Sequence, residues 1–429
     1  MTTFFRYLMI FGAVAFTVGF LVWDLRVDRH GPNTVTFFTM QLRPDFDHYF
    51  LPMLERFEEE NPGVTINWVD YPYDGYDSRI TTAMLGRNPP DVINLAWDRL
   101  RAYARGGNLL RLDEYLPEEV IASYVPQIIE EGCTYNGHVY ALPWYSSASV
   151  TLYNGAVLEQ AGISEDDVPR YFEDIPEFAR IIRAETGAVP FFPTMTDGGA
   201  IRTIMAEKGV PFLTEDRTRA AFNTPAAVEV LTYYKELFDE RLIPREVITA
   251  GHRRPLELFT AGQLAIYTGG GEFILRVREN APSVYENLIV GPKITWKDHE
   301  KFFINTHVLA VGARSDNPQL AAEFAAYVTN AENMLAFSKE VTIFPSVTEA
   351  FEDPWFSEPE DTPEGIARYQ GAQQVRRGRL FQSPPESTRI YRVLDEMVEQ
   401  ILQGQVTIEE GLATAERRVN RILEEAPSQ

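Results

Sequence analysis

The sequence has little cysteine and little histidine. Cys133 is the single cysteine among 429 residues, which excludes an internal disulfide and a zinc cluster built on several cysteines. Six histidines are present, and His307 has no His, Cys or carboxylate beside it at ligand spacing. We therefore expect no metal site and no cofactor. A chain exported to an oxidising compartment would tolerate one buried thiol.

Positive charge is also scarce. The 39 Lys and Arg residues are outnumbered by 62 Asp and Glu residues, which gives a net charge of −23. Because binding to nucleic acid requires clustered Lys and Arg against the phosphates, we expect no nucleic-acid partner. The local cluster of Arg376, Arg377 and Arg379 is typical of a solvated face rather than of a phosphate site.

A long charge-free hydrophobic run is present at residues 7–23. Its 17 residues are many for the core of a signal peptide and few for a membrane-spanning helix. No Cys follows the run, which excludes a lipoprotein anchor, and the run does not end in an A-x-A cleavage pattern. We expect residues 1–32 to form an uncleaved membrane anchor and linker, with the remainder outside the cytoplasmic membrane. A cleaved secretory signal is the alternative.

From residue 33 onward, the sequence alternates short apolar runs with amphipathic segments. Strands separated by helical crossovers predict a parallel α/β sheet. The first part of the chain is expected to form strands at 35–40, 64–69, 92–95, 138–142 and 150–153, and helices at 49–60 and 78–85. The later part is expected to be more helical, with helices at 175–185 and 224–240 and a closing helical stretch at 388–425.

One predicted strand is followed by an aromatic residue and a carboxylate. The short apolar run at 91–95 is typical of a buried parallel strand, and Trp97 and Asp98 lie beyond its carboxyl end. Ligands of open α/β sheets bind outside the carboxyl ends of the strands. An indole beside a carboxylate suits a sugar, because a pyranose offers an apolar face for stacking and hydroxyls that donate hydrogen bonds. A core tryptophan and a helix N-cap are the alternative interpretation of this pair.

Four further stretches strengthen this interpretation. They are FLPMLERFEEENPGVTINWVDYPYDGYDSRITTAMLGRNPPDV at 50–92, FTAGQLAIYTGGGEF at 259–273, LAAEFAAYVTNAENMLAFSKEVTIFPSV at 320–347 and GQVTIEEGLATAERRVNRIL at 404–423. In this order, they resemble the extracellular solute-binding proteins of carbohydrate ABC importers, the maltose-binding-protein-like group. No single stretch is diagnostic, but the ordered set covers nearly everything from residue 33 onward.

The resemblance implies an α/β fold of the type II periplasmic-binding-protein kind. This fold is a clamshell of two lobes with three interlobe crossings, here preceded by the N-terminal membrane helix. The first lobe is expected to comprise 33–146 and 308–352, and the second lobe 147–307 and 353–429. The implied partners are a carbohydrate ligand, the permease subunits of an ABC importer and the cytoplasmic membrane, and we expect a monomer. The binding domain is expected to be periplasmic or extracellular.

Candidate ligand-binding residues come from strand ends and from positions that match the family. Gln41 follows the first strand and has an amide that can donate and accept at once, and Tyr76 follows the second strand. In the family, the positions of Asp98 and Arg99 contact sugar hydroxyls, and Glu272 stands where the family has a stacking aromatic. The full set is Gln41, Tyr76, Asn94, Trp97, Asp98, Trp144, Tyr145, Gly270, Glu272, Phe273, Asn305 and Tyr391.

Several of these candidates have a structural alternative. Trp144 and Tyr145 follow a predicted strand at the first crossing, where an aromatic ring can face either lobe. Asn305 lies at the expected second crossing. Tyr391 matches a further stacking position of the family, but a tyrosine there could equally pack its helix onto the lobe. A surface turn would also account for Tyr76.

The resemblance implies non-covalent capture of a sugar, expected to be a di- or oligosaccharide, by closure of the lobes and its delivery to the permease. We expect no enzyme, since the sequence contains no G-x-S-x-G, H-E-x-x-H or Walker motif. Two alternatives stay open. With 62 acidic residues, a carboxylate pair of a glycoside hydrolase is not excluded by counting, and a sugar sensor could use the same clamshell.

Overall fold

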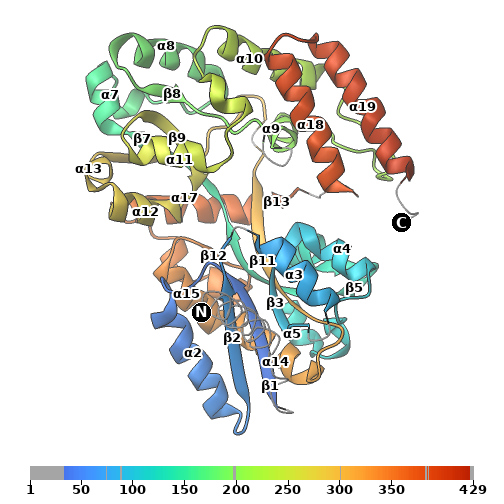
Figure 1. The fold of residues 1–429 in the computed structure, drawn as a ribbon. Coiled ribbons are helices and arrows are strands. Elements are labelled where there is room, and N and C mark those ends of the chain that lie inside the picture. The colour runs from blue at the N-terminus through green and yellow to red at the C-terminus, as the bar shows by residue number, and fades with distance from the viewer. Residues whose placement is uncertain are drawn as a thin grey trace, which may run out of the picture.

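The computed structural model describes residues 33–73, 75–86, 89–196, 200–299, 301–381, 384 and 386–425. Figure 1 shows two α/β lobes stacked one above the other, each built around its own sheet. The two-lobed α/β fold predicted from the sequence is therefore confirmed. The N-terminal membrane anchor predicted at 1–32 lies outside the described residues. In the part of the chain that the structure describes, no helix is both long and apolar enough to cross a membrane.

The first lobe is built on a mixed sheet. Its strands are β1 (Thr34–Met40), β2 (Thr65–Tyr71), β3 (Val92–Ala96), β6 (Ala141–Ser147), β11 (Phe303–Val311), β12 (Phe344–Pro345) and β13 (Arg379–Leu380). They lie in the order β12-β6-β11-β3-β1-β2, and β13 pairs with β11. β1 is parallel to β2 and β3, whereas β11 is antiparallel to β3 and β6. Parallel pairing in this sheet is thus found among β1, β2 and β3 and between β11 and β13, whereas the other pairs are antiparallel.

Both faces of this sheet are buried, which explains the continuous apolar runs of its strands. On one face, the ring of Phe37 packs 5.2 Å from that of Phe324, and on the other the ring of Phe38 packs 5.3 Å from that of Tyr71. The covering helices are α2 (Asp47–Glu60), α3 (Tyr76–Leu85), α4 (Leu100–Arg105), α5 (Glu118–Ala122), α6 (Pro126–Ile128), α14 (Pro318–Val328), α15 (Ala331–Glu340) and α16 (Thr348–Phe351). The strand predicted at 138–142 is divided between β6 and the small hairpin of β4 (Thr134–Tyr135) and β5 (His138–Val139).

The second lobe has a smaller sheet and more helices, as predicted. The strands β7 (Ser149–Asn154), β8 (Val189–Phe191), β9 (Leu264–Gly270) and β10 (Leu288–Gly291) lie in the order β10-β7-β9-β8. The helices are α7 (Gly155–Ala161), α8 (Ile175–Glu185), α9 (Ile201–Glu207), α10 (Pro225–Asp239), α11 (Arg253–Thr260), α12 (Phe273–Asn280), α13 (Pro282–Tyr285), α17 (Pro363–Arg377), α18 (Ser387–Leu402) and α19 (Ile408–Glu425). The closing stretch is two helices, because the chain turns at Gly404, whose φ of +71° suits glycine.

Up to α17, the chain passes between the lobes at three places. Ala148 alone separates β6 from β7, the segment after β10 leads to β11, and the segment after β12 leads to α17, which lies along the lower side of the second lobe in Figure 1. After α17 the chain returns briefly to the first sheet as β13, which was not predicted. β11 belongs to the first sheet from Phe303 onward. The predicted second lobe instead extended to residue 307, because the polar residues after 304 resemble the end of a strand.

Candidate functional site

The strands β1, β2 and β3 are parallel, so their carboxyl ends lie at one edge of the first sheet. Asp70 near the end of β2 accepts a hydrogen bond from the Thr39 hydroxyl at 2.6 Å and another from the backbone N–H of Leu42 at 3.1 Å. These bonds hold the turn after β1, in which Gln41 is exposed with a φ of +53°. Gln41 therefore lies at the edge of the sheet that its position after β1 predicts.

Four side chains form what we call the sheet-edge cluster: Tyr76, Asn94, Tyr145 and His307. The ring of Tyr145 on β6 stacks on the imidazole of His307 on β11, with ring centroids 4.9 Å apart and planes 19° apart. The Nδ1 atom of His307 lies 3.0 Å from Oδ1 of Asn94 on β3. The hydroxyl of Tyr76 donates to the carbonyl oxygen of Asn94 at 2.7 Å. Three strands and helix α3 thus contribute to one cluster.

The sheet-edge cluster is uncharged at neutral pH. Burial lowers the pKa of His307 to about 4, and burial raises the pKa values of Tyr76 and Tyr145. A neutral imidazole whose Nδ1–H donates to Asn94 fits the observed distance. The Nδ2 atom of Asn94 is buried, and the Asn94 side chain interacts with the Tyr145 hydroxyl, which offsets part of the rise in the pKa of Tyr145. This amide group is therefore part of the cluster and lies beside an aromatic ring.

Glu272 approaches this cluster from the second lobe. It lies between β9 and α12, and its negative charge contributes to the raised pKa of Tyr145 after burial itself. Burial raises the pKa of Glu272 to about 7, and its Oε2 atom has no hydrogen-bond partner among the described residues. A Cβ on Gly270 would lie 2.0 Å from that oxygen, and a Cβ on Gly271 would lie 2.8 Å from Cγ2 of Thr342 in the first lobe. The two glycines therefore allow this turn to pack closely.

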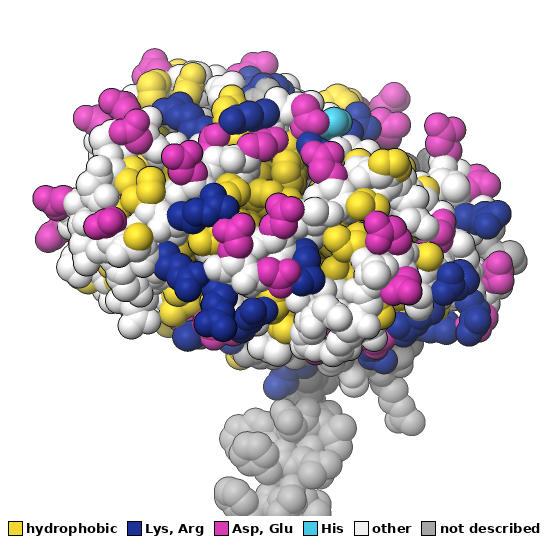
Figure 2. All heavy atoms as spheres, turned by 90° about the horizontal axis from the view of Figure 1, so that it is seen from above, with side chains coloured by type: hydrophobic (Ala, Val, Ile, Leu, Met, Phe, Trp, Pro, Cys, Tyr) yellow, Lys and Arg dark blue, Asp and Glu magenta, His cyan; other side chains and the backbone are white. Residues whose placement is uncertain are grey.

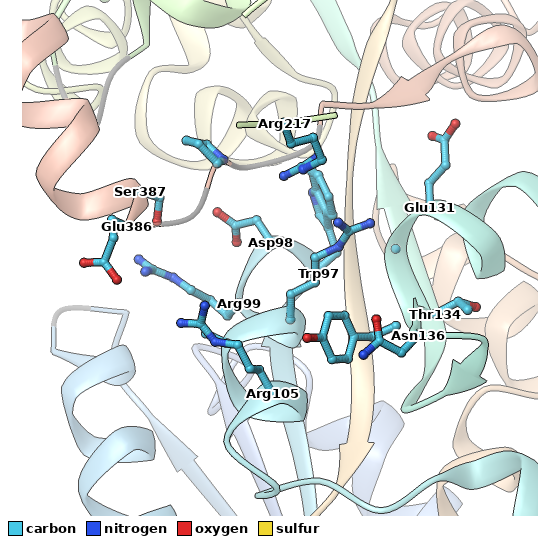
Figure 3. Close-up of a pocket in the computed structure, with 15 residues that line it drawn as sticks. Trp97, Asp98, Arg99, Arg105, Glu131, Thr134, Asn136, Arg217, Glu386 and Ser387 are labelled. Atoms are coloured by element: carbon cyan, nitrogen blue, oxygen red, sulfur yellow. The ribbon is translucent and has the colours of Figure 1, made fainter. Parts of the chain in front are cut away.

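A cavity of about 280 Å³, which we call the interlobe cavity, lies between the two lobes (Figure 3). The first lobe contributes residues from 97–105 and from 131–136. The second lobe contributes Arg217, from the loop before α10, and residues at the start of α18. The lining residues are Trp97, Asp98, Arg99, Arg101, Ala102, Arg105, Glu131, Gly132, Thr134, Tyr135, Asn136, Arg217, Pro384, Glu386 and Ser387. A molecule in this cavity would contact both lobes.

Trp97 and Asp98 both line this cavity, at the position beyond β3 that the sequence predicts. Trp97 is 8% exposed, and it also packs in the core with Phe38 and Leu100. The core interpretation and the cavity interpretation of Trp97 therefore both hold. Asp98 does not cap a helix, since the short 3₁₀ turn Trp97–Arg99 and helix α4 both begin without a side-chain cap.

Arg202 at the start of α9 was not predicted. Its guanidinium lies 4.4 Å from the ring centroid of Tyr391 and 4.8 Å from that of Phe381. Burial lowers the pKa of Arg202, while the charges of Tyr391 and Asp98 oppose that shift. Its Nε and Nη1 atoms have no hydrogen-bond partner among the described residues. Arg202 therefore covers the ring of Tyr391 and extends positive charge toward Asp98.

Three predicted residues lie apart from these two sites. Trp144 is 1% exposed in the core of the first lobe, where its ring centroid lies 6.0 Å from those of Phe50 and Phe337. Because successive strand residues point to opposite faces, Trp144 lies in the core while the ring of Tyr145 stacks on His307 in the sheet-edge cluster. Phe273 packs against Tyr267 of its own lobe. Asn305 is exposed within β11, opposite Ser147 of β6.

The sequence interpretation considered His307 only as a metal ligand and did not single out Arg101 or Arg217. A single histidine in a strand, an isolated arginine in a helix and another in a loop carry no recognisable spacing, so only the fold reveals their neighbours. Across the described ranges, no group of three or more His, Cys, Asp or Glu side chains is arranged to hold a metal ion.

Comparison with known proteins gives consistent relatives. The diacetylchitobiose binding protein of Streptomyces coelicolor is 26% identical over 268 residues, which cover 59% of this chain and 59% of that protein. A lactose-binding protein of Rhizobium radiobacter is 24% identical over 217 residues, which cover 49% of this chain and 50% of that protein. The chain thus matches about half to three fifths of the length of these curated relatives.

Solved structures match over almost their full length. A periplasmic-binding protein of Synechococcus sp. MITs9220 has a TM-score of 0.79 and 29% identity, with 91% of this chain and 99% of that chain covered. A cyclo/maltodextrin-binding protein complexed with maltotetraose has a TM-score of 0.74 at 18% identity, which shows a shared fold alone. The family model described as bacterial extracellular solute-binding protein matches residues 43–335, well over half of the chain. The chain therefore belongs to the family of bacterial extracellular solute-binding proteins.

Proposed function

We propose that this chain is the extracytoplasmic substrate-binding subunit of an ABC importer, and that it captures a di- or oligosaccharide between its lobes. The observation that carries the proposal is the interlobe cavity, in which Trp97 and Asp98 of the first lobe lie opposite Arg217 and Ser387 of the second. The relatives support a saccharide, because their names include proteins that bind diacetylchitobiose, arabinooligosaccharide and lactose.

The cavity has the side chains that sugar recognition requires. The rings of Trp97 and Tyr135 offer flat apolar surfaces for the C–H face of a sugar. Asp98 can accept hydrogen bonds from two hydroxyls, and Asn136 can donate and accept. The cavity volume of about 280 Å³ lies just below the range of small-ligand pockets, which measure about 300 to 1,000 Å³. The cavity therefore suits a small saccharide at this spacing of the lobes.

Capture would use hinge motion rather than covalent chemistry. A ligand that contacts both lobes binds the closed arrangement more tightly than the open one, so it shifts the population toward closure. The three connections between the sheets form the hinge, and the sheet-edge cluster lies beside it. The closed form would then dock on the permease subunits, and reopening would release the sugar unchanged.

We further propose that residues 1–32 hold the protein at the cytoplasmic membrane. The charge-free run at 7–23 would be the anchor, and residues 24–33 would be the linker. Fully extended, this linker would reach about 30 Å at ~3.3 Å per residue. Such tethering would raise the effective concentration of the binding lobes at the permease. N-terminal sequencing of the mature protein tests it, and a mature chain that begins near residue 24 would contradict it.

The test of sugar capture is a titration of the full chain against neutral and acidic di- and oligosaccharides, followed by intrinsic tryptophan fluorescence and calorimetry. At least one saccharide is expected to bind, and Asp98→Ala is expected to weaken its binding about tenfold, as the loss of a charge-assisted hydrogen bond does. Asp166→Ala is the matched control, since Asp166 is an exposed carboxylate of the second lobe. Release of shorter products during incubation would show a hydrolase, and the absence of binding to every saccharide would reject the proposal.

A further inference from the structure

A second cavity, which we call the hinge-side cavity, shares no lining residue with the interlobe cavity. Its volume is about 350 Å³. It is lined by α12 and α13 of the second lobe, by the last turn of α15 in the first lobe, and by residues between Trp355 and Arg368, where the third connection leads into α17. In Figure 1, α12 and α15 lie to the left of β11, whereas α4 and α18, which contribute to the interlobe cavity, lie to its right. The two cavities are therefore on opposite sides of the connections between the lobes.

Three buried polar atoms of lining residues have no hydrogen-bond partner among the described residues. They are Oγ of Ser338 on α15, Nε1 of Trp355 and Nε of Arg368 on α17. The whole side chains of Ser338 and Arg368 are buried, at 4% and 5% exposure. An indole N–H and a guanidinium N–H only donate, whereas a hydroxyl donates and accepts. Because a buried donor without an acceptor costs free energy, these groups indicate a partner that enters from the cavity beside them.

Contacts with one another hold these groups in one region. The guanidinium of Arg368 lies 3.6 Å from the ring centroid of Trp355, and its Nη2 atom pairs with Glu360 at 3.2 Å. The Nζ atom of Lys339, the residue after Ser338, lies 6.0 Å from the same ring centroid. Donors from the first lobe and from the third connection thus border the same space.

The charges around the hinge-side cavity are balanced. Every lining carboxyl group except that of Glu272 has a basic partner: the pairs are Arg278 with Glu364 at 2.9 Å, Arg368 with Glu360 at 3.2 Å and His48 with Glu340 at 2.8 Å. Lys339 forms no ion pair within the described ranges. Burial raises the pKa of Glu272 to about 7, so this carboxyl carries part of a negative charge at neutral pH. Lys339 and Glu272 have opposite signs, so the lining has no excess positive charge that would select an anion.

The outer surface of the second lobe also has no preference for one sign of charge. Figure 2, which looks down on this lobe, shows acidic side chains spread with basic ones among them. Hydrogen bonding, rather than charge, is therefore the property that distinguishes the hinge-side cavity.

We propose that the hinge-side cavity binds a small neutral polyhydroxylated molecule, a polyol or a monosaccharide, whose hydroxyl oxygens accept hydrogen bonds from Ser338, Trp355 and Arg368. Hydroxyl groups also donate, so the same molecule can donate to Glu272 on the side of the second lobe. Side-chain rotations of the kind that commonly accompany binding would bring the buried donors to the ligand. The volume of about 350 Å³ lies within the range of small-ligand pockets, about 300 to 1,000 Å³.

This site is separate from sugar capture in the interlobe cavity and does not rest on the proposed function. Both lobes and the third connection line it. An occupant would therefore stabilise the spacing of the lobes at which the hinge-side cavity has this shape.

The test follows the indole N–H signal of Trp355 by nuclear magnetic resonance, on the full chain labelled with nitrogen-15 tryptophan. Trp355→Phe identifies this signal among those of the six tryptophans, because it removes one indole N–H. Glycerol, mannitol and glucose are the neutral probes, and acetate and inorganic phosphate are the charged ones. At least one neutral probe is expected to shift the signal and to saturate it with a Kd of about 1 mM. The charged probes are expected to bind at least about tenfold more weakly.

Variants separate binding from structure. Ser338→Ala removes one hydrogen bond to the ligand and should weaken binding about fivefold. Because that hydroxyl has no partner in the free protein, Ser338→Ala should not lower the Tm, whereas loss of a structural hydrogen bond would. Ser283→Ala, at an exposed position of α13 outside the lining, is the matched control. Leu275→Trp places a large ring in the lining and should abolish binding, with circular dichroism to verify that the variant is folded.

Asp98→Ala distinguishes the two cavities. It changes the interlobe cavity alone, so the response of Trp355 should persist in this variant. If Asp98→Ala abolishes the response, the signal reports a ligand in the interlobe cavity and the inference is wrong, while sugar capture stands. If the response persists and no saccharide binds in the interlobe cavity, the proposed function fails and the inference stands.

Two further outcomes would overturn the inference. If the Trp355 signal does not shift, or shifts without saturation, the neutral probes are adventitious additives only. If acetate or inorganic phosphate binds as tightly as the best neutral probe, the cavity takes an anion instead.

Discussion

The sheet-edge cluster and the interlobe cavity both begin at β3, yet they differ in charge and in how they are held. The cluster is buried, neutral and joined by hydrogen bonds within the first lobe, with Glu272 the group that approaches from the second. The cavity is charged, and both lobes supply its lining. This difference indicates that the cluster is formed before a ligand arrives, whereas the cavity depends on the spacing of the lobes.

The largest expected effect concerns the core that supports the sheet-edge cluster. Trp144→Ala removes a ring that packs against Phe50 and Phe337, and it should lower the free energy of unfolding by about 3 to 5 kcal/mol. Trp144→Phe keeps a ring at this position and should cost much less. Urea denaturation followed by circular dichroism measures both. Equal stability of the alanine variant and the wild type would contradict the core position.

The second prediction uses acid to charge the neutral cluster. Burial lowers the pKa of His307 to about 4, so between about pH 6.5 and pH 4 the unfolded chain binds a proton that the folded chain does not. The free energy of unfolding should therefore fall by up to about 3 kcal/mol over this range. His307→Gln should remove this part of the pH dependence. A difference between variant and wild type that does not change with pH would be inconsistent with a buried neutral imidazole.

The third prediction has the opposite sign. Burial raises the pKa of Glu272 to about 7, so as the pH rises from 4.5 through 7 the folded chain keeps a proton that the unfolded chain releases, and stability is lost. Above pH 8, Glu272→Gln should be more stable than the wild type by about 2 kcal/mol. This is less than the full pKa shift would give, because solvent beside the half-buried side chain screens part of the effect. Thermal unfolding at pH 5 and pH 8.5 measures this. Glu279→Gln, at an exposed position of the helix α12 that follows Glu272, serves as the control.

The smallest expected effect concerns the close contact of the lobes. A Cβ on Gly271 would lie 2.8 Å from Cγ2 of Thr342, so Gly271→Ala should destabilise the protein by about 1 kcal/mol through overpacking. Thr342→Ser removes that methyl group and should restore stability in the double variant. A double-mutant cycle measures the coupling. If the two substitutions add without coupling, this contact between the lobes does not exist in solution.

The sequence predicts the fold better than it predicts the site. The alternation of strands and helices identifies the two-lobed α/β fold, and Trp97 and Asp98, which were singled out by their position after β3, line the interlobe cavity. The difference between Trp144 and Tyr145 could not be predicted, because both faces of β6 carry aromatic residues and nothing in the local pattern shows which faces the core. Arg217 lies 116 residues from Arg101 in the sequence, so only tertiary folding brings the two together.

The joint at Ala148 has a mechanical consequence. Because a single residue separates β6 from β7, a rotation of a few degrees in its backbone dihedrals turns one sheet relative to the other, and the other two connections bend with it. The resulting displacement grows with distance from Ala148. The far rim of each lobe therefore travels furthest, so under the proposed function a permease that touches those rims would distinguish a loaded protein from an empty one.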